Sequence, residues 1–450
     1  MNYKFRKTLL IPTLLLVIFI QVLAGGEVYA EQKLSVPEQD YSHFQLENGL
    51  DIYVLEDHSL PLVEFSIWYQ VGSIDEPEGL SGISHLLEHV MFLGTDTLKK
   101  EQVHKLVKEV GGRSNAGTTF DYTRYYEKIP SAKLELAMAI EADRMRNLKI
   151  DPEEVAREKE VVKQERRQRI ENDVFSSSLE EIQATAFPES PLNHQVIGWM
   201  EDIENTSDGD LKNYYQQYYV PNNAVMVVAG DVDPGQVHSL AQKYYGDYQP
   251  QTIERPDFRA ADQQQQRELT LEKVTNLPII VMMYKVPAGD HPDKVAIDAL
   301  LDLLVNNDTS RVRTTLQREK ELIVESGGGM YALRIPGFVL VYLVPRSQEL
   351  FDRVMEGFDR ELELIKQGEV TGDEVQIVKK ASLKQGIFRH KKIDTAAQVI
   401  GSNVIRFSDP DLHRENLQRV QQLTAEDIAR VANEYFDKDN RTVGYIIPEK

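Results

Sequence analysis

The 450-residue sequence contains no cysteine, which excludes a disulfide framework, an iron–sulfur cluster, a cysteine nucleophile and a thiolate zinc site. Basic residues are also in the minority. The 51 Lys and Arg against 72 Asp and Glu give a formal net charge of −21, which argues against a nucleic-acid-binding protein. Histidine is scarce, with 10 residues. Any catalytic site must therefore use histidine, carboxylate, hydroxyl or lysine side chains.

The first 30 residues have the pattern of a secretory signal peptide. The segment opens with basic residues, continues through a mostly apolar run at 9–24, and ends on the small-residue exit formed by Val28 and Ala30. We therefore expect cleavage after residue 30 and export to the periplasm or the medium. The alternative is an uncleaved membrane anchor, because the apolar run is near the lower length limit of a spanning helix. Only that alternative implies contact with a membrane.

The rest of the chain is predicted to contain two copies of one fold. Residues 61–72 and 278–289 both open on proline, run through apolar residues and close on glycine. Residues 210–232 and 427–449 share a helix–turn–strand pattern, and the offset is again 217 residues, from position 61 to 278 and from position 210 to 427. A constant offset near both ends of the copies indicates duplication. The alternative is that two unrelated helix–turn–strand segments simply look alike.

Each predicted copy combines glycine-punctuated strands with long helices. This favours an α+β fold in which helices pack on a largely antiparallel sheet. We expect an N-terminal domain at residues 31–250 and a homologous C-terminal domain at 268–450. Residues 251–267 lie between them, are polar and lack periodicity, and are the predicted linker.

The strongest chemical signal is the string HLLEH at residues 85–89. On a helix, His85 and His89 are four residues apart and share a face, so both imidazoles can reach one metal ion. Glu88 lies beside that ion and is placed to act on a water molecule rather than to bind the metal. The H-x-x-E-H order is the inverted form of a zinc-peptidase helix. The alternative is a helix with two buried, hydrogen-bonded histidines.

A catalytic zinc site needs a third protein ligand and one open position. The candidate ligands lie on a predicted helix at residues 151–172, which begins with Asp-Pro. Glu158 and Glu165 are seven residues apart on it and therefore project from one face. The residues alone do not choose Glu165 from the other acids of this very charged segment, which are Glu153, Glu154, Glu158 and Glu160.

The motif His85-x-x-Glu88-His89, with Glu165 downstream, resembles the pitrilysin family of inverted zinc peptidases. The strings VGSIDE from residue 71, NAGTTFDYTRYY from 115 and REKEVVKQE from 157 match the same family. The length and the duplication resemble its short-subunit branch, which includes the catalytic subunit of mitochondrial processing peptidase. The resemblance implies tandem domains that form a half-shell of a chamber. It also implies Glu165 as the third ligand and Glu158 as the carboxylate that orients a zinc-binding histidine.

The resemblance further implies how a substrate binds. Asn115 and Ala116 would lie on an edge strand beside the metal, where an extended peptide adds as another strand. The alternative for Asn115 is a turn after Gly111 and Gly112. Family members often supply an Arg and a Tyr from the second half to steady the substrate carbonyl. Arg318 is the candidate for the Arg, whereas the Tyr position falls on valine or glutamate in this chain.

The combined expectation is a zinc-dependent endopeptidase that hydrolyses peptides or unfolded segments inside a chamber. Zn²⁺, one ion per chain, would be held by His85, His89 and Glu165, with Glu88 as general base; manganese or cobalt are alternative metals. The second copy lacks the ligands, because an offset of 217 places Asp302 at the position of His85. The expected partner is a second copy or a related subunit. The alternative function is a non-catalytic or partner-dependent subunit of a two-chain assembly.

Overall fold

The computed structural model describes residues 40–256, 258, 263–390 and 392–449. The predicted signal segment at 1–30 and part of the predicted linker, residues 257 and 259–262, lie outside the described residues. Across the described ranges, no helix combines the length and the apolar character that a membrane span requires.

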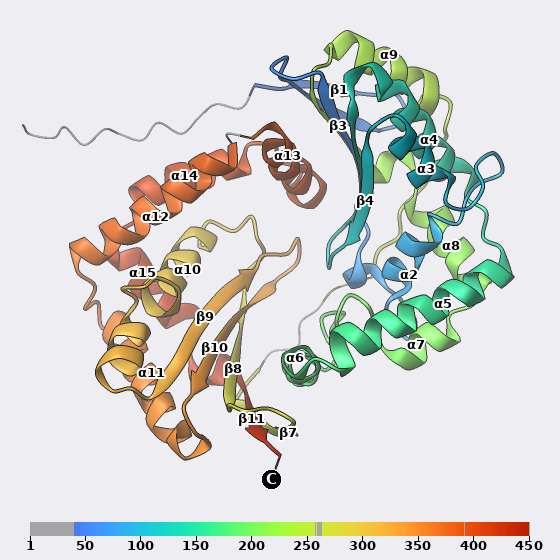
Figure 1. Cartoon of the computed structure of the whole chain (residues 1–450). Helices are drawn as coiled ribbons and strands as arrows, with labels where there is room; N and C mark the ends of the chain where they lie inside the picture. Colours follow the sequence, from blue (N-terminus) through green and yellow to red (C-terminus); the bar gives the residue numbers. More distant parts are fainter. Residues whose placement is uncertain (1–39, 257, 259–262, 391, 450) are drawn as a thin grey trace, which may run out of the picture. The chain divides into compact units, whose positions relative to one another are not determined.

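The described chain contains two β-sheets (Figure 1). The first has the strand order β1-β2-β6-β3-β5-β4, and the second has the order β7-β11-β8-β10-β9. The strands of the first sheet are β1 (Ser42–Gln45), β2 (Asp51–Glu56), β3 (Leu62–Tyr69), β4 (Arg113–Thr118), β5 (Thr123–Pro130) and β6 (Ala224–Gly230). Those of the second are β7 (Arg267–Lys273), β8 (Ile279–Val286), β9 (Ile323–Tyr331), β10 (Gly337–Pro345) and β11 (Arg441–Pro448).

The second sheet repeats the topology of the first. Strands β7, β11, β8, β10 and β9 take the places of β2, β6, β3, β5 and β4 in the same order. In each sheet one pair is parallel, β2 with β6 and β7 with β11, and the other pairs are antiparallel. Strand β1 alone has no counterpart in this arrangement of the described strands. The predicted α+β fold with tandem, largely antiparallel domains is confirmed.

The helices lie between these strands along the chain. Labels with α denote α-helices, and labels with η denote short 3₁₀- or π-helices. Those of the first half are η1 (Ser73–Asp75), α2 (Ile83–Val90), α3 (Gln102–Glu109), η2 (Ser131–Lys133), α4 (Leu134–Asn147), α5 (Pro152–Arg166), η3 (Arg167–Glu171), α6 (Val174–Ala186), α7 (Met200–Asn205), α8 (Asp208–Tyr218), η4 (Pro221–Asn223) and α9 (Pro234–Tyr245). Those of the second half are α10 (Lys294–Leu301), η5 (Asp302–Asn306), η6 (Arg313–Glu319), η7 (Gln348–Leu350), α11 (Phe351–Lys366), α12 (Gly372–His390), α13 (Ile393–Phe407), α14 (Leu412–Gln422), α15 (Ala425–Tyr435) and η8 (Lys438–Asn440).

Strand β6 shows why its segment is apolar throughout rather than alternating. All of its residues are buried, because side chains on both faces of the strand are covered. Met226 and Val228 point into the core shared with helices of the first half. Val225 and Val227 point to the opposite face, where they pack against residues of α13. The first sheet is therefore enclosed by layers that come from different halves of the chain.

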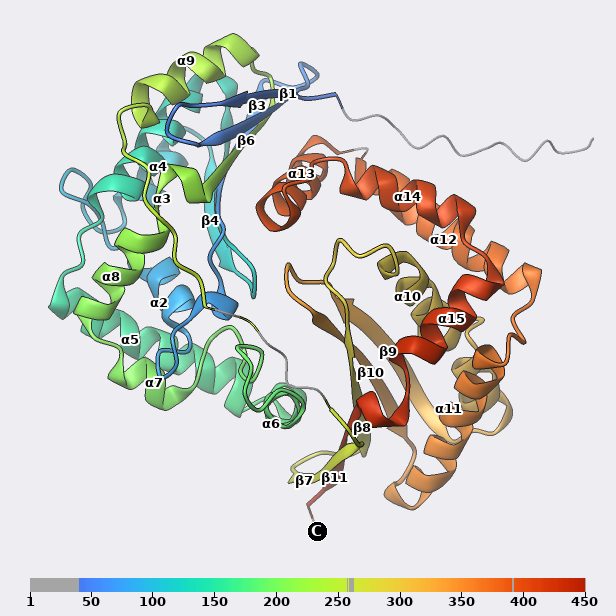
Figure 2. The same cartoon turned by 180° about the vertical axis from the view of Figure 1, so that it is seen from behind.

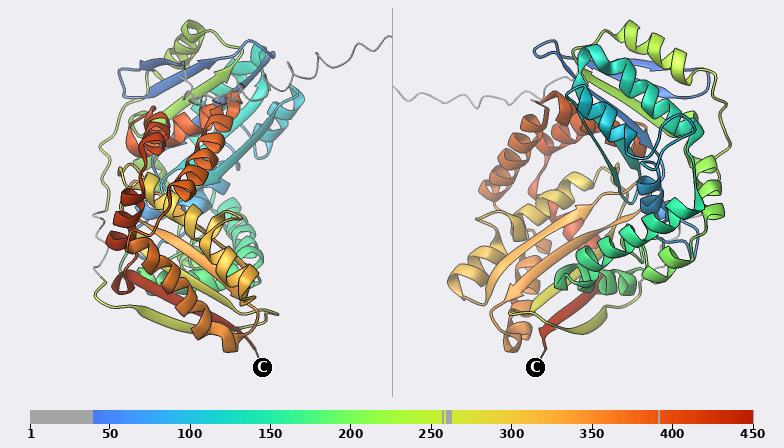
Figure 3. Two further views of the ribbon diagram at one scale, coloured as in Figure 1. Left: turned by 90° about the vertical axis from the view of Figure 1, so that its left-hand side faces the viewer. Right: turned by 45° about the vertical axis from the view of Figure 1, so that its right-hand side comes forward.

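The two halves exchange one helix each (Figures 1, 2 and 3). Helix α13 of the second half packs on β6 and β3 of the first sheet. Helix α6 of the first half packs on β11, β7 and β8 of the second sheet. Each sheet thus buries one face against a helix of the other half, so the two halves share cores and support one another's geometry.

Glycine allows the closest approach at both exchanged helices. A Cβ atom at Gly401 of α13 would lie 2.5 Å from the Trp68 ring on β3. A Cβ atom at Gly444 of β11 would lie 2.2 Å from the side chain of Ile182 on α6. Both separations are far below van der Waals contact, so a larger residue at either position forces the facing side chain or the helix itself to move.

We expect Gly401→Ala to lower the free energy of unfolding by about 1–3 kcal/mol, the usual cost of overpacking a close contact. Gly372→Ala is the matched control, because a Cβ at that first residue of α12 meets nothing within 4 Å. Alanine should there be neutral or slightly stabilising. Chemical denaturation of both variants measures the difference. Equal stability of the two variants would show that α13 does not pack tightly on the first sheet.

Candidate metal centre

Helix α2 begins at Ile83 and carries the HLLEH string. The helix is amphipathic, with one apolar and one polar face. Gly82 precedes it with φ of +87°, and a Cβ there would lie 2.3 Å from a backbone oxygen of Ile197, so only glycine fits. The carboxylate of Glu76 accepts from the backbone N–H groups of Gly82 at 2.7 Å and Ser84 at 2.9 Å. These bonds satisfy donors that the helix start would otherwise leave unpaired.

Helix α5 carries the glutamates that face α2. It begins where the sequence predicts, because the Asp151 side chain accepts from the backbone N–H groups of Glu153 and Glu154 and Pro152 occupies the first turn. Val155 and Val162 are buried on the same side of the helix. This anchors the α5 face from which the two glutamates seven residues apart project towards α2.

The three predicted ligands converge. His85, His89 and Glu165 each offer a ligand atom within 4.8 Å of the others. Among the described residues, this is the one group of three or more histidine or carboxylate side chains close enough together to hold a metal ion. Nε2 of His89 lies 3.3 Å from Oε2 of Glu165, and Nε2 of His85 lies 3.7 Å from Oε1. Two imidazoles and one carboxylate fit a catalytic zinc site with an open position.

Glu158 lies where an orienting carboxylate is expected. Its Oε1 is 3.0 Å from Nδ1 of His89, on the side of the ring opposite to Glu165. A carboxylate in this position fixes the ring and leaves Nε2 free to face a metal. The side chains of Glu158 and His89 are 15% and 21% exposed, so water competes little for this bond.

The surroundings shift the pKa values of the two histidines, His85 and His89, in opposite directions. Burial lowers the pKa of His85 to about 4, and the charge of His89 acts in the same direction. Burial also opposes charge on His89, but hydrogen bonds to Glu158 and Glu165 outweigh it and raise its pKa to about 9. The hydrogen bond with His89 lowers the pKa of Glu165. The carboxylates that stabilise a proton on His89 would equally stabilise a divalent cation beside it.

Glu88 is not part of the converging group, and its carboxylate is oriented by a hydrogen bond from Thr118. Thr118 Oγ1 donates to Oε2 of Glu88 at 2.6 Å, which leaves the other carboxylate oxygen without this bond. Burial raises the pKa of Glu88, although the bond from Thr118 acts against this. A buried carboxylate with a raised pKa is suited to accept and return a proton.

Asn115 and Ala116 lie on β4, at the edge of the first sheet. The turn predicted as the alternative for Asn115 is therefore wrong. The strand borders a cavity of about 650 Å³. Its lining joins residues of α2, β4, α5 and η3 with the segment 195–197, and includes His85, Glu88, His89, Phe92, Leu93, Asn115, Ala116, Gly117, Thr118, Glu158, Glu165 and Arg169. An open strand edge at this cavity can hydrogen-bond to an extended peptide.

The structure does not bring Arg318 into this cavity. Arg318 lies on η6 of the second half and is absent from the described lining residues. Tyr331, a tyrosine near the expected clamp position, stacks on Phe338 with ring centroids 4.4 Å apart. It too is absent from that lining. Among the described residues, the lining of the cavity comes from the first half of the chain alone.

Two further residues, Thr118 and Arg169, lie at the site and were not predicted from the sequence. Thr118 belongs to the string NAGTTFDYTRYY, so its match to the family was the available signal. Arg169 follows Glu165 by four residues, a spacing that brings side chains together on a helix. Its guanidinium lies 2.6 Å from Oε1 of Glu165 and holds that carboxylate from the solvent side.

Fold and site together define a class of protein, the inverted zinc peptidases, in which an H-x-x-E-H helix faces a glutamate-bearing helix in the first of two tandem α+β domains. Residues 52–198 match the family described as Insulinase (Peptidase family M16), and residues 206–382 match the Peptidase M16 inactive domain. The chain belongs to peptidase family M16, which confirms the predicted pitrilysin resemblance.

Individual relatives agree with this family. Zinc protease PqqE of Helicobacter pylori is 30% identical over 434 residues, covering 95% of this chain and 96% of that protein. Mitochondrial-processing peptidase subunit beta of Blastocladiella emersonii is 29% identical over 223 residues, covering 50% of this chain and 47% of that protein. The crystal structure of a protease from Helicobacter pylori matches with a TM-score of 0.86 and 30% identity, covering 91% of this chain and 100% of that one.

Proposed function

We propose that this chain is a zinc-dependent endopeptidase. The observation that carries the proposal is the convergence of His85, His89 and Glu165 beside Glu88 and the open edge of β4. In the proposal His85, His89 and Glu165 hold one Zn²⁺, and Glu158 orients His89. A zinc ion there would supply a Lewis acid that polarises the scissile carbonyl and acidifies water beside it.

The protein's own residues account for the remaining chemistry. A peptide that pairs with β4 at Asn115 and Ala116 is held through its main chain, so many sequences can bind. Glu88 takes a proton from water as the water oxygen bonds to the carbonyl carbon. The carbon–nitrogen bond then breaks, and Glu88 passes the proton to the leaving amine nitrogen. Thr118 keeps the Glu88 carboxylate in one orientation during both transfers.

A peptide-library digest tests this function. We expect protein loaded with Zn²⁺ to cleave internal peptide bonds, protein treated with a chelator to stop, and restored Zn²⁺ to recover cleavage. Mass spectrometry of the products identifies the bonds cut and separates endopeptidase from exopeptidase activity. No cleavage by the zinc-loaded protein, alone or combined with a related subunit, would contradict the proposal.

We further propose that the chain is exported with loss of residues 1–30 and that it works with a second copy or a related subunit. The relative named mitochondrial-processing peptidase subunit beta supports the assembly. The preparation used for the digest reports on both points. Its intact mass shows whether residues 1–30 are removed, and light scattering during size exclusion gives the mass of the cleaving species.

A further inference from the structure

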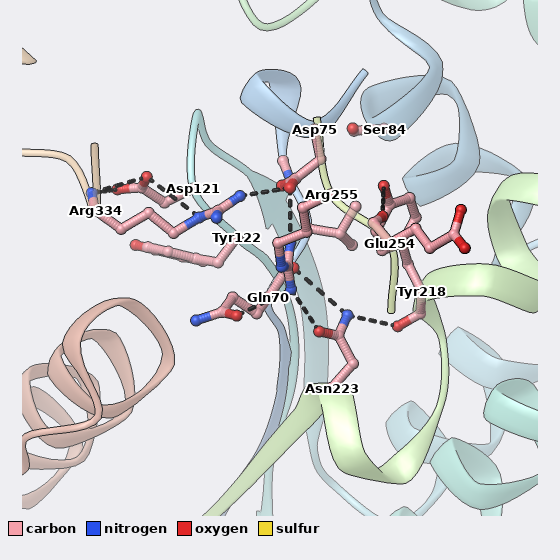
Figure 4. A network of polar contacts seen from close by, with 12 residues as sticks. Gln70, Asp75, Ser84, Asp121, Tyr122, Tyr218, Asn223, Glu254, Arg255 and Arg334 are labelled. Atoms are coloured by element: carbon pink, nitrogen blue, oxygen red, sulfur yellow. Dashed lines mark hydrogen bonds and ion pairs between the residues drawn. The ribbon is translucent and has the colours of Figure 1, made fainter. Parts of the chain in front are cut away.

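The segment between β3 and α2 contains a carboxylate that two arginines share. Asp75 lies on η1 and is 0% exposed. Its Oδ2 accepts from the backbone N–H of Gly72 at 3.0 Å. Its Oδ1 accepts from Arg255 Nη1 at 2.6 Å and also from Arg334 Nη2. Figure 4 shows both guanidinium groups directed at this one side chain.

These arginines come from outside the first sheet and its helices. Arg255 lies in the predicted linker and also donates to Gln70 and Asn223, at 2.9 Å and 2.7 Å. Arg334 lies between β9 and β10 of the second half. Asp75 therefore ties the start of the α2 segment both to the linker and to the half of the chain that lacks the metal ligands.

Arg334 also contacts the segment that follows β4. Its backbone N–H donates to Oδ1 of Asp121 at 3.1 Å, in the turn between β4 and β5. That turn is joined directly to η1, because the backbone N–H groups of Ser73 and Ile74 donate to the carbonyls of Thr119 and Phe120. A single residue of the second half thus holds both the entry to α2 and the end of the edge strand.

The Arg334 loop is itself anchored. Arg406 Nη1 of α13 donates to the carbonyl of Ala332 at 2.9 Å, and the backbone N–H of Gly289 donates to the carbonyl of Leu333 at 2.7 Å. Because α13 also covers the first sheet, the loop carrying Arg334 is tied to the first half by more than its own side chain.

The path from Asp75 to the site is short. Glu76 is the next residue, and its carboxylate accepts from the N–H groups of Gly82 and Ser84 at the start of α2. His85 follows Ser84 directly. A displacement of Asp75 would therefore shift Glu76, and the Glu76 carboxylate would shift the start of α2. Helix α2 carries two of the three proposed ligands and Glu88.

We propose that Arg334 and Arg255 are positioning residues that fix α2 and β4 in one relative position. This rests on the proposed function, because it assumes that α2 carries the catalytic groups and β4 the substrate. Two guanidiniums share one carboxylate, so removing either leaves Asp75 paired with the other and avoids the large penalty of an unpaired buried charge. The fold should survive while the relative position relaxes.

The experiment compares Arg334→Gln, Arg255→Gln and Arg334→Lys with a control that breaks another contact between the halves. Asp394→Asn is that control, because Lys128 of β5 pairs with Asp394 of α13 at 3.0 Å without touching the α2 segment. The readouts on the full-length chain are hydrogen exchange of peptides from residues 72–93 and 113–122, bound zinc, and kcat and KM on a cleaved peptide.

We expect both glutamine variants to speed hydrogen exchange in residues 72–93 and 113–122. Their kcat should fall about tenfold with KM changed less than about twofold, because misplaced groups slow the reaction more than they weaken binding. Arg334→Lys should recover most of kcat, whereas Asp394→Asn should change neither exchange in these peptides nor kcat.

Unchanged exchange in residues 72–93 and 113–122, or an equal effect of Asp394→Asn, would overturn the proposal. If the unmodified protein cleaves nothing, the proposed function fails, and the exchange pattern alone decides whether Arg334 and Arg255 position α2 and β4. If the unmodified protein cleaves and the glutamine variants cleave equally fast, the positioning role fails while the function stands.

Discussion

Glu88→Gln is expected to abolish measurable peptide cleavage, with a loss of about 10²–10⁴-fold, the usual contribution of a general base. Glutamine keeps the size of the side chain and can still accept the hydrogen bond that Thr118 donates to Oε2 of Glu88. It cannot accept a proton from water at neutral pH. Because Glu88 is not one of the converging ligands, the bound zinc should stay at the wild-type level.

The measurement pairs initial cleavage rates with metal analysis of the same sample. Glu101→Gln is the matched control, since Glu101 lines the same cavity but lies outside the HLLEH string. It should retain both zinc and cleavage. Cleavage by Glu88→Gln at the wild-type rate would remove Glu88 from the proposed mechanism, and loss of its zinc would reassign it as a ligand.

Glu165→Gln is expected to cause the largest loss of zinc, and cleavage should disappear with the metal. The carboxylate of Glu165 is the anionic member of the converging group, so its replacement removes a ligand and the charge that favours a cation. Glu158→Gln should have an intermediate effect, about 10–100-fold weaker zinc binding, because an orienting partner of a ligand is lost rather than the ligand itself.

Competition with a chromogenic chelator measures these affinities. Glu153→Gln is the control on the same helix, because its side chain is 85% exposed and pairs only weakly with Arg157 at 3.5 Å. We expect zinc to bind most tightly to the Glu153→Gln variant, less tightly to Glu158→Gln and least tightly to Glu165→Gln. An equal loss in the last two variants would contradict the separate roles of the two glutamates.

The choice among the α5 glutamates shows where the sequence stops being informative. Spacing alone identifies Glu158 and Glu165 as neighbours on one face of a helix, but a charged helix presents several such faces. Only the packing of α2 against α5 decides which face meets the histidines. Sequence reasoning is limited in the same way for the arginines of the second half. The family resemblance implied Arg318, which is not among the residues lining the cavity. No sequence pattern indicated Arg334, which contacts Asp75.

The sequence by itself determined the duplication, the α+β class, and the pairing of His85 with His89. These follow from periodicities and short spacings, which the backbone geometry of a single segment converts directly into shared faces. Only the tertiary structure decided that α6 packs on the second sheet and α13 on the first, and that Arg334 of the second half contacts Asp75 in the segment before α2. It also brings Glu165, which the family resemblance implied but the residues alone did not single out, beside His85 and His89. Those contacts join segments far apart in the chain. They depend on how whole surfaces pack, and no local pattern of residues encodes them.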